Sequence, residues 1–278
     1  MKKILIGVAP VSHTGVKIPK GINNPLTPDE VANEVLDCNK KGASMVHLHV
    51  RDDKGEQTAD LFHFTRTLDL IRRESDIIIQ GSTGGVAELS LEERCVSLNE
   101  PRVEVASLNM GSANLGEGVY INTLPDIRFW AQRMLENEVI PEMEIFDLSM
   151  VNSVSKIYKE GLAQPPFSFN FCMGFENAIQ ANVDNLFYLK NSIPTGSHWG
   201  LIHEDMNDFS LLVTAACMGA VSLRVGFEDS FYYAKGKLVK SNAEMVERLV
   251  EILARIGYEP MTSDEARKIM GIPALQSV

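Results

Sequence analysis

Cysteine is scarce in this chain of 278 residues, and no two cysteines are spaced as a CxxC pair. The four are Cys38, Cys95, Cys172 and Cys217. Each lies in an apolar or helical stretch, where cysteine usually behaves as a small buried hydrophobic residue. We therefore expect neither disulfide bonds nor a metal site built from cysteine.

Long apolar runs are also missing. A membrane-spanning helix needs about 18 to 20 apolar residues, and no segment approaches that length. The run from Ile4 to Val11 follows two lysines, but it contains Gly7 and Pro10 and precedes no credible cleavage site. We interpret it as a buried first strand rather than a signal peptide. We expect a cytoplasmic protein without a membrane partner.

Basic residues are outnumbered, with 26 Lys and Arg against 37 Asp and Glu and a formal net charge of −11. Proteins that bind nucleic acid by neutralising phosphates normally present a basic surface. We therefore expect no nucleic-acid partner. Hydrophobic residues make up 45% of the chain, which is ample for a large core.

The turn after the first strand reads APVSHTGVKIPKG and lacks the GxGxxG motif typical of an open doubly wound sheet. Instead, strand-like runs alternate with helical patterns along the chain. The candidate strands are 3–9, 44–50, 76–80, 103–108, 140–146, 167–172, 197–202 and 220–225. The candidate helices are 27–42, 61–75, 90–99, 123–138, 150–161, 177–192, 207–219 and 242–257.

Strict alternation of this kind requires parallel strands with crossover helices. Eight units in about 250 residues match the size of a closed (β/α)₈ TIM barrel. We expect residues 1–278 to form a single α/β domain, with a C-terminal helical extension from about residue 260 that suits subunit contacts. In such a barrel, functional residues gather at the carboxyl ends of the strands.

A pair of histidines stands on the second candidate strand, in the segment VHLHVRD. Residues two apart on a strand point to the same side, so His47 and His49 face together into the barrel. Burying two unpaired imidazoles costs free energy, and a divalent metal would satisfy both. The alternative is that both side chains form hydrogen bonds within the core without a metal.

The strongest candidate for a third ligand follows the last strand, in the segment RVGFED. Glu228 would complete a His₂Glu site, which is a known arrangement for catalytic zinc. Asp229 would then be a free carboxylate near the metal, positioned as a general base. The alternative is that Glu228 and Asp229 open an ordinary surface loop.

Other strand ends carry short polar segments that suit substrate binding. After the third strand, GSTGG offers hydroxyls and accessible backbone N–H groups to an anion, and SLNMGS follows the fourth. Glu142 and Glu144 alternate with apolar residues on the fifth strand, so both are expected to point inward and to need a partner such as Arg51 or Arg224.

Taken together, HLHVRD, STGG, SLN, PEMEIFD and RVGFED resemble the β-keto acid cleavage enzymes in order and spacing over nearly the whole chain. The prototype of that family acts on 3-keto-5-aminohexanoate. The resemblance implies a zinc-dependent (β/α)₈ acyltransferase that converts a β-keto acid and acetyl-CoA into acetoacetate and a new acyl-CoA. It also suggests a homo-oligomer, with a tetramer favoured.

Carried over by motif, the resemblance assigns roles to particular residues. The metal ligands would be His47, His49 and Glu228, and Asp229 paired with Arg224 would remove the C2 proton. The keto acid's carboxylate and neighbouring atoms would be held by Ser82, Gly85, Ser107 and Asn109. Ser107 stands where the prototype has threonine, a change that keeps the hydroxyl.

One position departs from the prototype. The glutamate that meets the substrate's ammonium group is replaced by Gly15, with Val16, Lys17 and His13 nearby and no carboxylate in that stretch. This favours a neutral or acidic β-keto acid as the substrate, and Lys17 is a candidate for binding an anionic substituent of that substrate. The sequence assigns no role to His198.

Two other functions compete with this reading. A metal-dependent amidohydrolase also places an HxH pair in a barrel, although usually after the first strand. A non-catalytic metal-dependent ligand-binding protein would bind the metal normally but would not depend on Asp229 for keto-acid turnover.

Overall fold

A parallel barrel forms the centre of the protein in a computed structural model that describes residues 1–85 and 89–275. Its strands are β1 (Lys2–Val8), β2 (Met45–Leu48), β3 (Ile78–Gly81), β4 (Val105–Asn109), β7 (Ile140–Ile145), β8 (Ser168–Met173), β9 (His198–His203) and β10 (Ser222–Val225). They pair in that order, and β10 pairs in turn with β1, which closes the barrel. The predicted (β/α)₈ fold is therefore confirmed.

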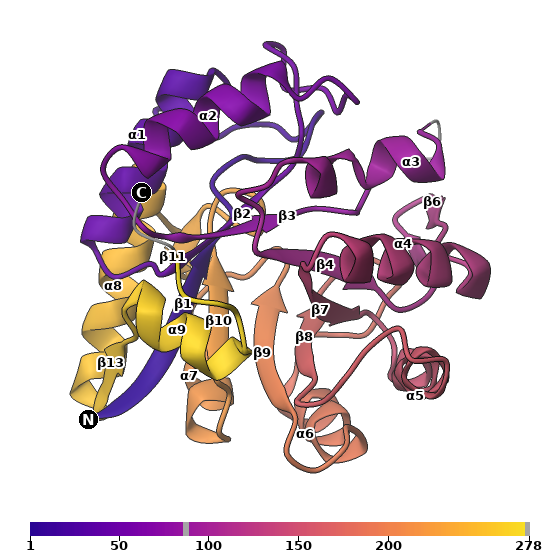
Figure 1. The fold of residues 1–278 in the computed structure, drawn as a ribbon. Coiled ribbons are helices and arrows are strands. Elements are labelled where there is room, and N and C mark those ends of the chain that lie inside the picture. The colour runs from indigo at the N-terminus through magenta and orange to yellow at the C-terminus, as the bar shows by residue number, and fades with distance from the viewer. Residues whose placement is uncertain (86–88, 276–278) are drawn as a thin grey trace.

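Helices surround the strands on the outside (Figure 1). They are α1 (Pro28–Lys40), α2 (Phe62–Arg72), α3 (Leu91–Arg94), α4 (Leu124–Glu136), α5 (Val151–Lys159), α6 (Val183–Ser192), α7 (Ser210–Cys217) and α8 (Asn242–Arg255). The predicted start of α1 is confirmed, because Thr27 and Glu30 form a capping box and Pro28 stands in the first turn.

Two predicted helices are wrong in extent. The segment predicted as one helix at 90–99 divides into α3 and a short 3₁₀ helix, Val96–Asn99, because Cys95 between them leaves the helical conformation (φ −104°, ψ 17°). Helix α6 begins six residues later than the predicted 177–192. Asn177 adopts a positive φ of 66°, which a helix does not allow, and Asn182 then provides the N-cap.

Two short hairpins and one short strand were not predicted from the sequence. The hairpin β5 (Ala113–Leu115) and β6 (Gly118–Tyr120) follows β4, and a second hairpin pairs β11 (Tyr232–Ala234) with β12 (Lys237–Leu238). Strand β13 (Tyr258–Pro260) adds to the amino end of β1. The hairpin β5–β6 matters most, because it rises from the barrel end where a site is expected.

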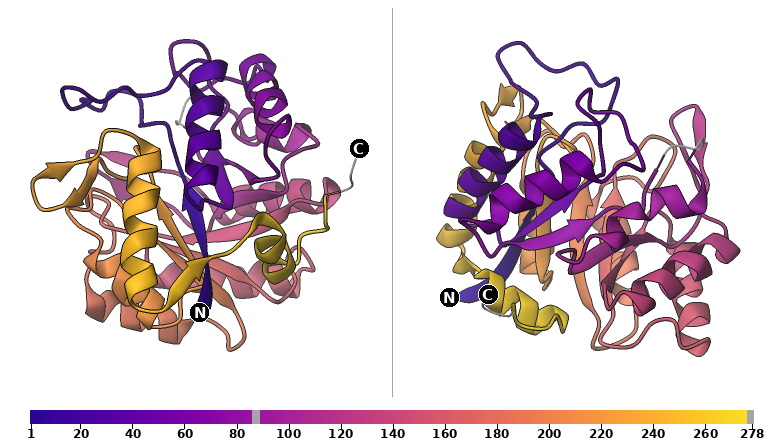
Figure 2. Two further views of the ribbon diagram at one scale, coloured as in Figure 1. Left: turned by 90° about the vertical axis from the view of Figure 1, so that its left-hand side faces the viewer. Right: turned by 45° about the horizontal axis from the view of Figure 1, so that its top comes forward.

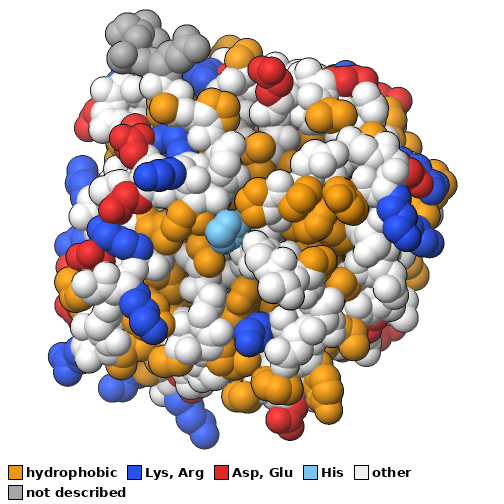
Figure 3. Space-filling view, turned by 60° about the horizontal axis from the view of Figure 1, so that its bottom comes forward, with side chains coloured by type: hydrophobic (Ala, Val, Ile, Leu, Met, Phe, Trp, Pro, Cys, Tyr) orange, Lys and Arg blue, Asp and Glu red, His pale blue; other side chains and the backbone are white. Residues whose placement is uncertain are grey.

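The predicted C-terminal helix is α9 (Ser263–Met270), which lies across the amino end of the barrel (Figure 2). Its Ala266 and Met270 pack with Leu5, Met45 and Ile78 from inside the barrel. Hydrophobic side chains gather on this end of the molecule (Figure 3). A cavity of about 520 Å³ lies beside α9, between the start of β7 and the loop before β8.

The cysteines are free, and the prediction that all of them are buried is wrong at one position. Cys38, Cys95 and Cys172 are buried, whereas Cys217 is exposed at the end of α7. Among the described residues, no helix combines the length and the apolar character that crossing a membrane requires.

Candidate active site

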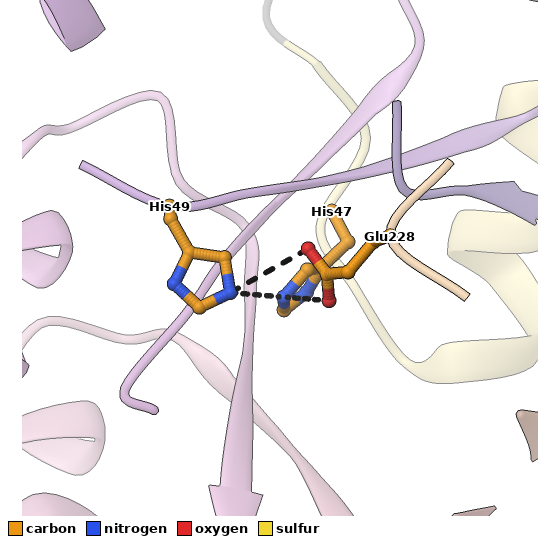
Figure 4. A group of neighbouring side chains, drawn as sticks. All are labelled: His47, His49 and Glu228. Carbon is orange, nitrogen blue, oxygen red and sulfur yellow. Dashed lines mark hydrogen bonds and ion pairs between the residues drawn. The ribbon is translucent and has the colours of Figure 1, made fainter. Parts of the chain in front are cut away.

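Three side chains from opposite ends of the sequence converge at the carboxyl end of the barrel (Figure 4). His47 lies on β2, His49 directly after it, and Glu228 in the loop after β10. The two Nε2 atoms are 3.4 Å apart. Glu228 Oε1 lies 3.7 Å from Nε2 of His47, and its Oε2 lies 3.6 Å from Nε2 of His49. This group could hold a metal ion.

The spacing of these three side chains is close to that of ligands around a small divalent metal ion such as zinc. Zinc binds histidine nitrogen and carboxylate oxygen at about 2.0 to 2.2 Å in tetrahedral geometry, so its ligand atoms lie roughly 3.3 to 3.6 Å apart. The two Nε2 atoms, 3.4 Å apart, fall within that range, and the Glu228 oxygens lie at its upper limit from His49 (3.6 Å) and just beyond it from His47 (3.7 Å). A surface loop, the alternative for Glu228, is excluded because this residue is only 7% exposed.

A chain of buried amides and a carboxyl group orients His47. Nδ1 of His47 lies 2.7 Å from Oε1 of Gln80, which fixes the proton on Nδ1 and leaves Nε2 free to bind a metal. Gln80 Nε2 and Asn170 Nδ2 donate to Oε2 of Glu142, at 2.5 and 3.0 Å. The expected arginine partner of Glu142 is therefore wrong, because two amides take that place.

Arg51, the other proposed partner of the inner glutamates, points elsewhere. Its guanidinium donates to the carbonyl of Gly55 and the hydroxyl of Thr14. Glu144 faces the pocket without a salt bridge to an arginine among the described residues, and burial raises its pKa to about 8.

Burial and charge act oppositely on the converging groups. Burial lowers the pKa of His47 to about 3 and also lowers that of His49, so both imidazoles are neutral at neutral pH, as metal binding requires. Burial alone would raise the pKa of Glu228. The Arg224 guanidinium, 3.1 Å from Oε1, opposes this, and the pKa of Glu228 lies well below its ordinary value, so Glu228 stays ionised.

Arg224 joins the two acidic residues of the loop after β10. Its Nε lies 3.0 Å from Oδ2 of Asp229 and its NH2 group contacts Oδ1, while the same NH2 lies 3.1 Å from Oε1 of Glu228. Asp229 is thus ion-paired rather than free. Burial raises the pKa of Asp229 above its ordinary value, with Arg224 opposing part of that increase.

The shape of this loop depends on Gly226. Its φ is +142°, and a Cβ there would lie 2.2 Å from the carbonyl oxygen of Ala9. The backbone N–H of Glu228 donates to that same carbonyl. Glycine therefore lets the loop approach β1 closely enough to aim Glu228 at the histidines.

A pocket of about 220 Å³ opens beside these groups. Its described lining consists of His13, His47, His49, Gln57, Ser82, Gly84, Gly85, Asn109, Leu115, Tyr120, Glu144, Phe146, Cys172, Phe175, Ile202, Arg224 and Glu228. Asn109 is fully buried, and neither its amide nitrogen nor its amide oxygen has a hydrogen-bond partner among the described residues. Such a side chain calls for a polar ligand.

Two of the predicted site residues lie behind the pocket wall rather than on it, as far as the described lining extends. Asp229 stands behind Arg224. The hydroxyl of Ser107 accepts from the backbone N–H of Thr83 at 3.3 Å, so Ser107 supports the loop that carries Ser82. Lys17 is exposed and, like Gly15, is absent from the described lining.

The sequence missed two kinds of residue here. Gln57, whose amide lies 2.9 Å from Nδ1 of His49, and Gln80 orient the histidines. Tyr120, Phe146 and Phe175 give the pocket its aromatic wall. The signal for Gln80 is a polar residue that ends an otherwise apolar strand, level with His47.

This combination defines a barrel protein with three converging side chains that could hold one metal ion, a buried arginine–carboxylate pair and a small pocket. Residues 3–272 match the family model for beta-keto acid cleavage enzyme. The chain belongs to the β-keto acid cleavage enzyme family, as the sequence motifs predicted.

Individual relatives agree with the family assignment. A 3-keto-5-aminohexanoate cleavage enzyme from Fusobacterium nucleatum subsp. nucleatum is 37% identical over 276 residues, covering 98% of this chain and 99% of the relative. A 3-oxoadipate:acetyl-CoA acetyltransferase from Cupriavidus necator is 32% identical, covering 96% and 95%.

A solved structure described as the apo form of ObcA superposes with a TM-score of 0.76 at 18% identity. The match covers 90% of this chain and 66% of that one, and it supports the barrel fold.

Proposed function

We propose that this protein is a zinc-dependent enzyme that condenses a β-keto acid with acetyl-CoA and releases acetoacetate and a new acyl-CoA. The observation that carries this proposal is the convergence of His47, His49 and Glu228 beside the Arg224–Asp229 pair, in a chain of this family. The name of the relative from Cupriavidus necator supports acetyl-CoA as the co-substrate.

The donor set suits zinc in its catalytic form, with two imidazoles, one carboxylate and room for a substrate oxygen. When bound, zinc withdraws charge from the substrate ketone and makes the C2 proton more acidic. Neutral His47 and His49 and ionised Glu228 are the protonation states that hold such an ion.

Asp229 is the proposed base for the C2 proton, and because it stands behind Arg224, the Arg224 side chain must shift for the carboxylate to reach C2. A carboxylate with a raised pKa is a better proton acceptor than an ordinary aspartate. Arg224 lines the pocket and holds Asp229, so it orients the base and also stabilises negative charge that develops on the substrate.

The overall reaction balances without another reactant. The C2 carbanion attacks the carbonyl carbon of acetyl-CoA and forms a carbon–carbon bond. The CoA sulfur leaves that carbon and bonds to the former ketone carbon of the keto acid, and the bond between this carbon and C2 then breaks. Acetoacetate regains the C2 proton, and the rest of the keto acid leaves as acyl-CoA.

Substrate binding is assigned to the polar side of the pocket. Asn109, whose amide has no hydrogen-bond partner among the described residues, is available to the keto acid's carboxylate or neighbouring atoms. Ser82 and Gly85 lie on the same wall. Ser107 contributes indirectly, because it holds the backbone of Thr83 within that loop.

The remaining features of the proposal concern the cell and the assembly. We propose a single-domain cytoplasmic protein that works as a homo-oligomer, with a tetramer favoured. The hydrophobic surface beside α9 supports subunit contacts. Light scattering coupled to size exclusion measures the subunit number directly, and a monomer would contradict this part of the proposal.

The function is tested by incubating the metal-loaded protein with acetyl-CoA and a panel of β-keto acids and assaying acetoacetate. Formation of acetoacetate together with the matching acyl-CoA is expected. Hydrolysis without a thioester would instead favour an amidohydrolase.

Asp229→Asn tests the base. This variant should keep the metal but lose C2 proton exchange in deuterated water by a factor of about 100 or more. Asp184→Asn, on the outer helix α6, is the control and should exchange normally. Continued exchange in Asp229→Asn would remove Asp229 from this role.

A further inference from the structure

The pocket is built in two layers, and the register of the strands defines them. Glu144, Asn170 and Gly200 stand level with one another on β7, β8 and β9. Asn109 pairs with Glu144 from β4. This lower layer is polar and lies beside the proposed metal site.

The layer above it is apolar. Phe146, Cys172 and Ile202 follow Glu144, Asn170 and Gly200 by two residues, so they point to the same side, one step nearer the carboxyl ends of the strands. All three line the pocket.

Side chains from the β5–β6 hairpin and from the loop after β8 complete the apolar layer. Tyr120, on the hairpin β5–β6, packs edge to face on Phe146 with ring centres 5.9 Å apart. Phe175, in the loop after β8, packs on the same ring at 5.1 Å. Leu115 of the hairpin adds an aliphatic side chain to this wall.

The charged side chains of the described pocket lining lie in the polar lower layer and around the proposed metal site. Among the described lining residues, the ionisable side chains other than Tyr120 and Cys172 are three histidines, Glu144, Glu228 and Arg224. Arg224 is already paired with Glu228 and Asp229. Arg94 lies over the ring of Tyr120, 5.5 Å from its centre, but it is outside the described lining and already donates to the carbonyl of Ile121 and the amide oxygen of Asn122. A substrate carboxylate or ammonium group entering the apolar layer would lose water and gain no unpaired ionic partner among the described lining residues.

We propose that this apolar layer is the subsite for the substituent of the keto acid, so that the substrate carries a short uncharged alkyl chain beyond the ketone. This inference rests on the proposed function, which places the carboxylate and ketone against the polar layer and the metal. Each methylene group buried in the apolar layer should strengthen binding about fourfold.

Three six-carbon keto acids that differ in one charge test the subsite: 3-oxohexanoate, 3-oxoadipate and 5-amino-3-oxohexanoate. Binding to the metal-loaded protein is measured by calorimetry without acetyl-CoA, and kcat/KM is measured with it. The dissociation constant of 3-oxohexanoate should be at least about tenfold lower than those of both charged acids.

The two measurements separate this inference from the function. If 3-oxohexanoate binds best but none of the three is turned over, the subsite stands and the proposed reaction fails. If turnover occurs with equal or better use of a charged acid, the reaction stands and the subsite is overturned. Absence of binding by 3-oxohexanoate also overturns it.

Phe175→Lys places a cation in the apolar layer and should invert the preference. Binding of 3-oxohexanoate should weaken about tenfold, and that of 3-oxoadipate should strengthen. Phe187→Lys is the matched control, because Phe187 is 55% exposed on α6 and should leave both values unchanged. Leu115→Lys makes the same test from the hairpin if Phe175→Lys does not fold. An unchanged preference in the folded variant contradicts the proposal.

Discussion

Gln80 is a single uncharged side chain that orients one of the three proposed metal ligands. It is fully buried, and its amide oxygen faces Nδ1 of His47 while its amide nitrogen donates to Glu142. Groups that fix the second nitrogen of a ligating histidine typically change metal affinity 10- to 100-fold when they are removed.

Gln80→Leu should therefore weaken metal binding by about 10- to 100-fold, because His47 loses the acceptor that fixes its tautomer. Competition with a chelator measures the dissociation constant, and circular dichroism checks the fold. Gln132→Leu, on the exposed face of α4, is the control and should bind normally. An unchanged dissociation constant in folded Gln80→Leu would contradict the role given to this amide.

Glu144 predicts a pH dependence of stability. Burial raises its pKa to about 8 in the folded protein, against an ordinary value of 4.5. Between these values the folded protein holds a proton that the unfolded chain releases, so this contribution is full below about pH 4.5 and is lost as the pH rises through 8.

Glu144→Gln removes that titration. Relative to the wild type, the free energy of unfolding of the variant should rise between pH 5 and 8, by at most about 1.4 kcal/mol per pH unit. Urea denaturation of chelator-treated protein at several pH values measures it. Glu117→Gln, at the exposed hairpin turn, should show no such trend. A difference that does not change with pH would mean that Glu144 is ionised in the folded protein.

At the level of residues, the sequence predicted which three side chains converge but not their surroundings. His47, His49 and Glu228 stand in short patterns whose chemistry is local, so strand periodicity and strand order were enough to bring them together. The aromatic wall looks like ordinary core sequence, because Phe146 and Phe175 carry no polar signal. Only the register of β7, β8 and β9 shows that this part of the barrel faces a pocket.

Among the elements, the loop after β10 is the most constrained. Gly226 combines a φ of +142° with a backbone approach to Ala9 that leaves no room for a Cβ. Gly219 also has a positive φ, +96°, but a Cβ there would meet nothing within 4 Å. Comparing alanine substitutions at Gly226 and Gly219 therefore separates the cost of backbone strain from the cost of a steric clash.

Gly226→Ala should lower the free energy of unfolding by roughly 3 kcal/mol or more and reduce metal content, because the loop must move away from β1. Gly219→Ala should cost about 1 to 2 kcal/mol and keep the metal. Urea denaturation and elemental analysis give both values. Equal losses in the two variants would contradict the account of this loop.

The elements that the sequence predicted well are those with strong patterns. All eight barrel strands were found because each is a short run rich in apolar residues, and the capping box at Thr27 placed the start of α1. The β5–β6 hairpin was missed because its strands are three residues each and lie half exposed, so no alternation develops. Gly116, with a positive φ of 56°, marks its turn.

For the whole molecule, the number of alternating units predicted the closed barrel, and the pairing of β10 with β1 confirms it. Strand pairing then places residues 47 and 228 together although most of the chain separates them. The sequence could not show which inward-facing side chains are covered by α9 and which open to the pocket. That division depends on which end of the barrel is covered, and α9 covers the amino end, beside Leu5 and Met45.

The most direct test of the account is a crystal structure of the zinc-loaded protein with an anomalous difference map at the zinc edge. One peak is predicted, at about 2.0 to 2.2 Å from Nε2 of His47, Nε2 of His49 and a carboxylate oxygen of Glu228. A map with no peak there, or with zinc bound by other side chains while these three form hydrogen bonds to one another, would contradict the proposed centre and the chemistry assigned to it.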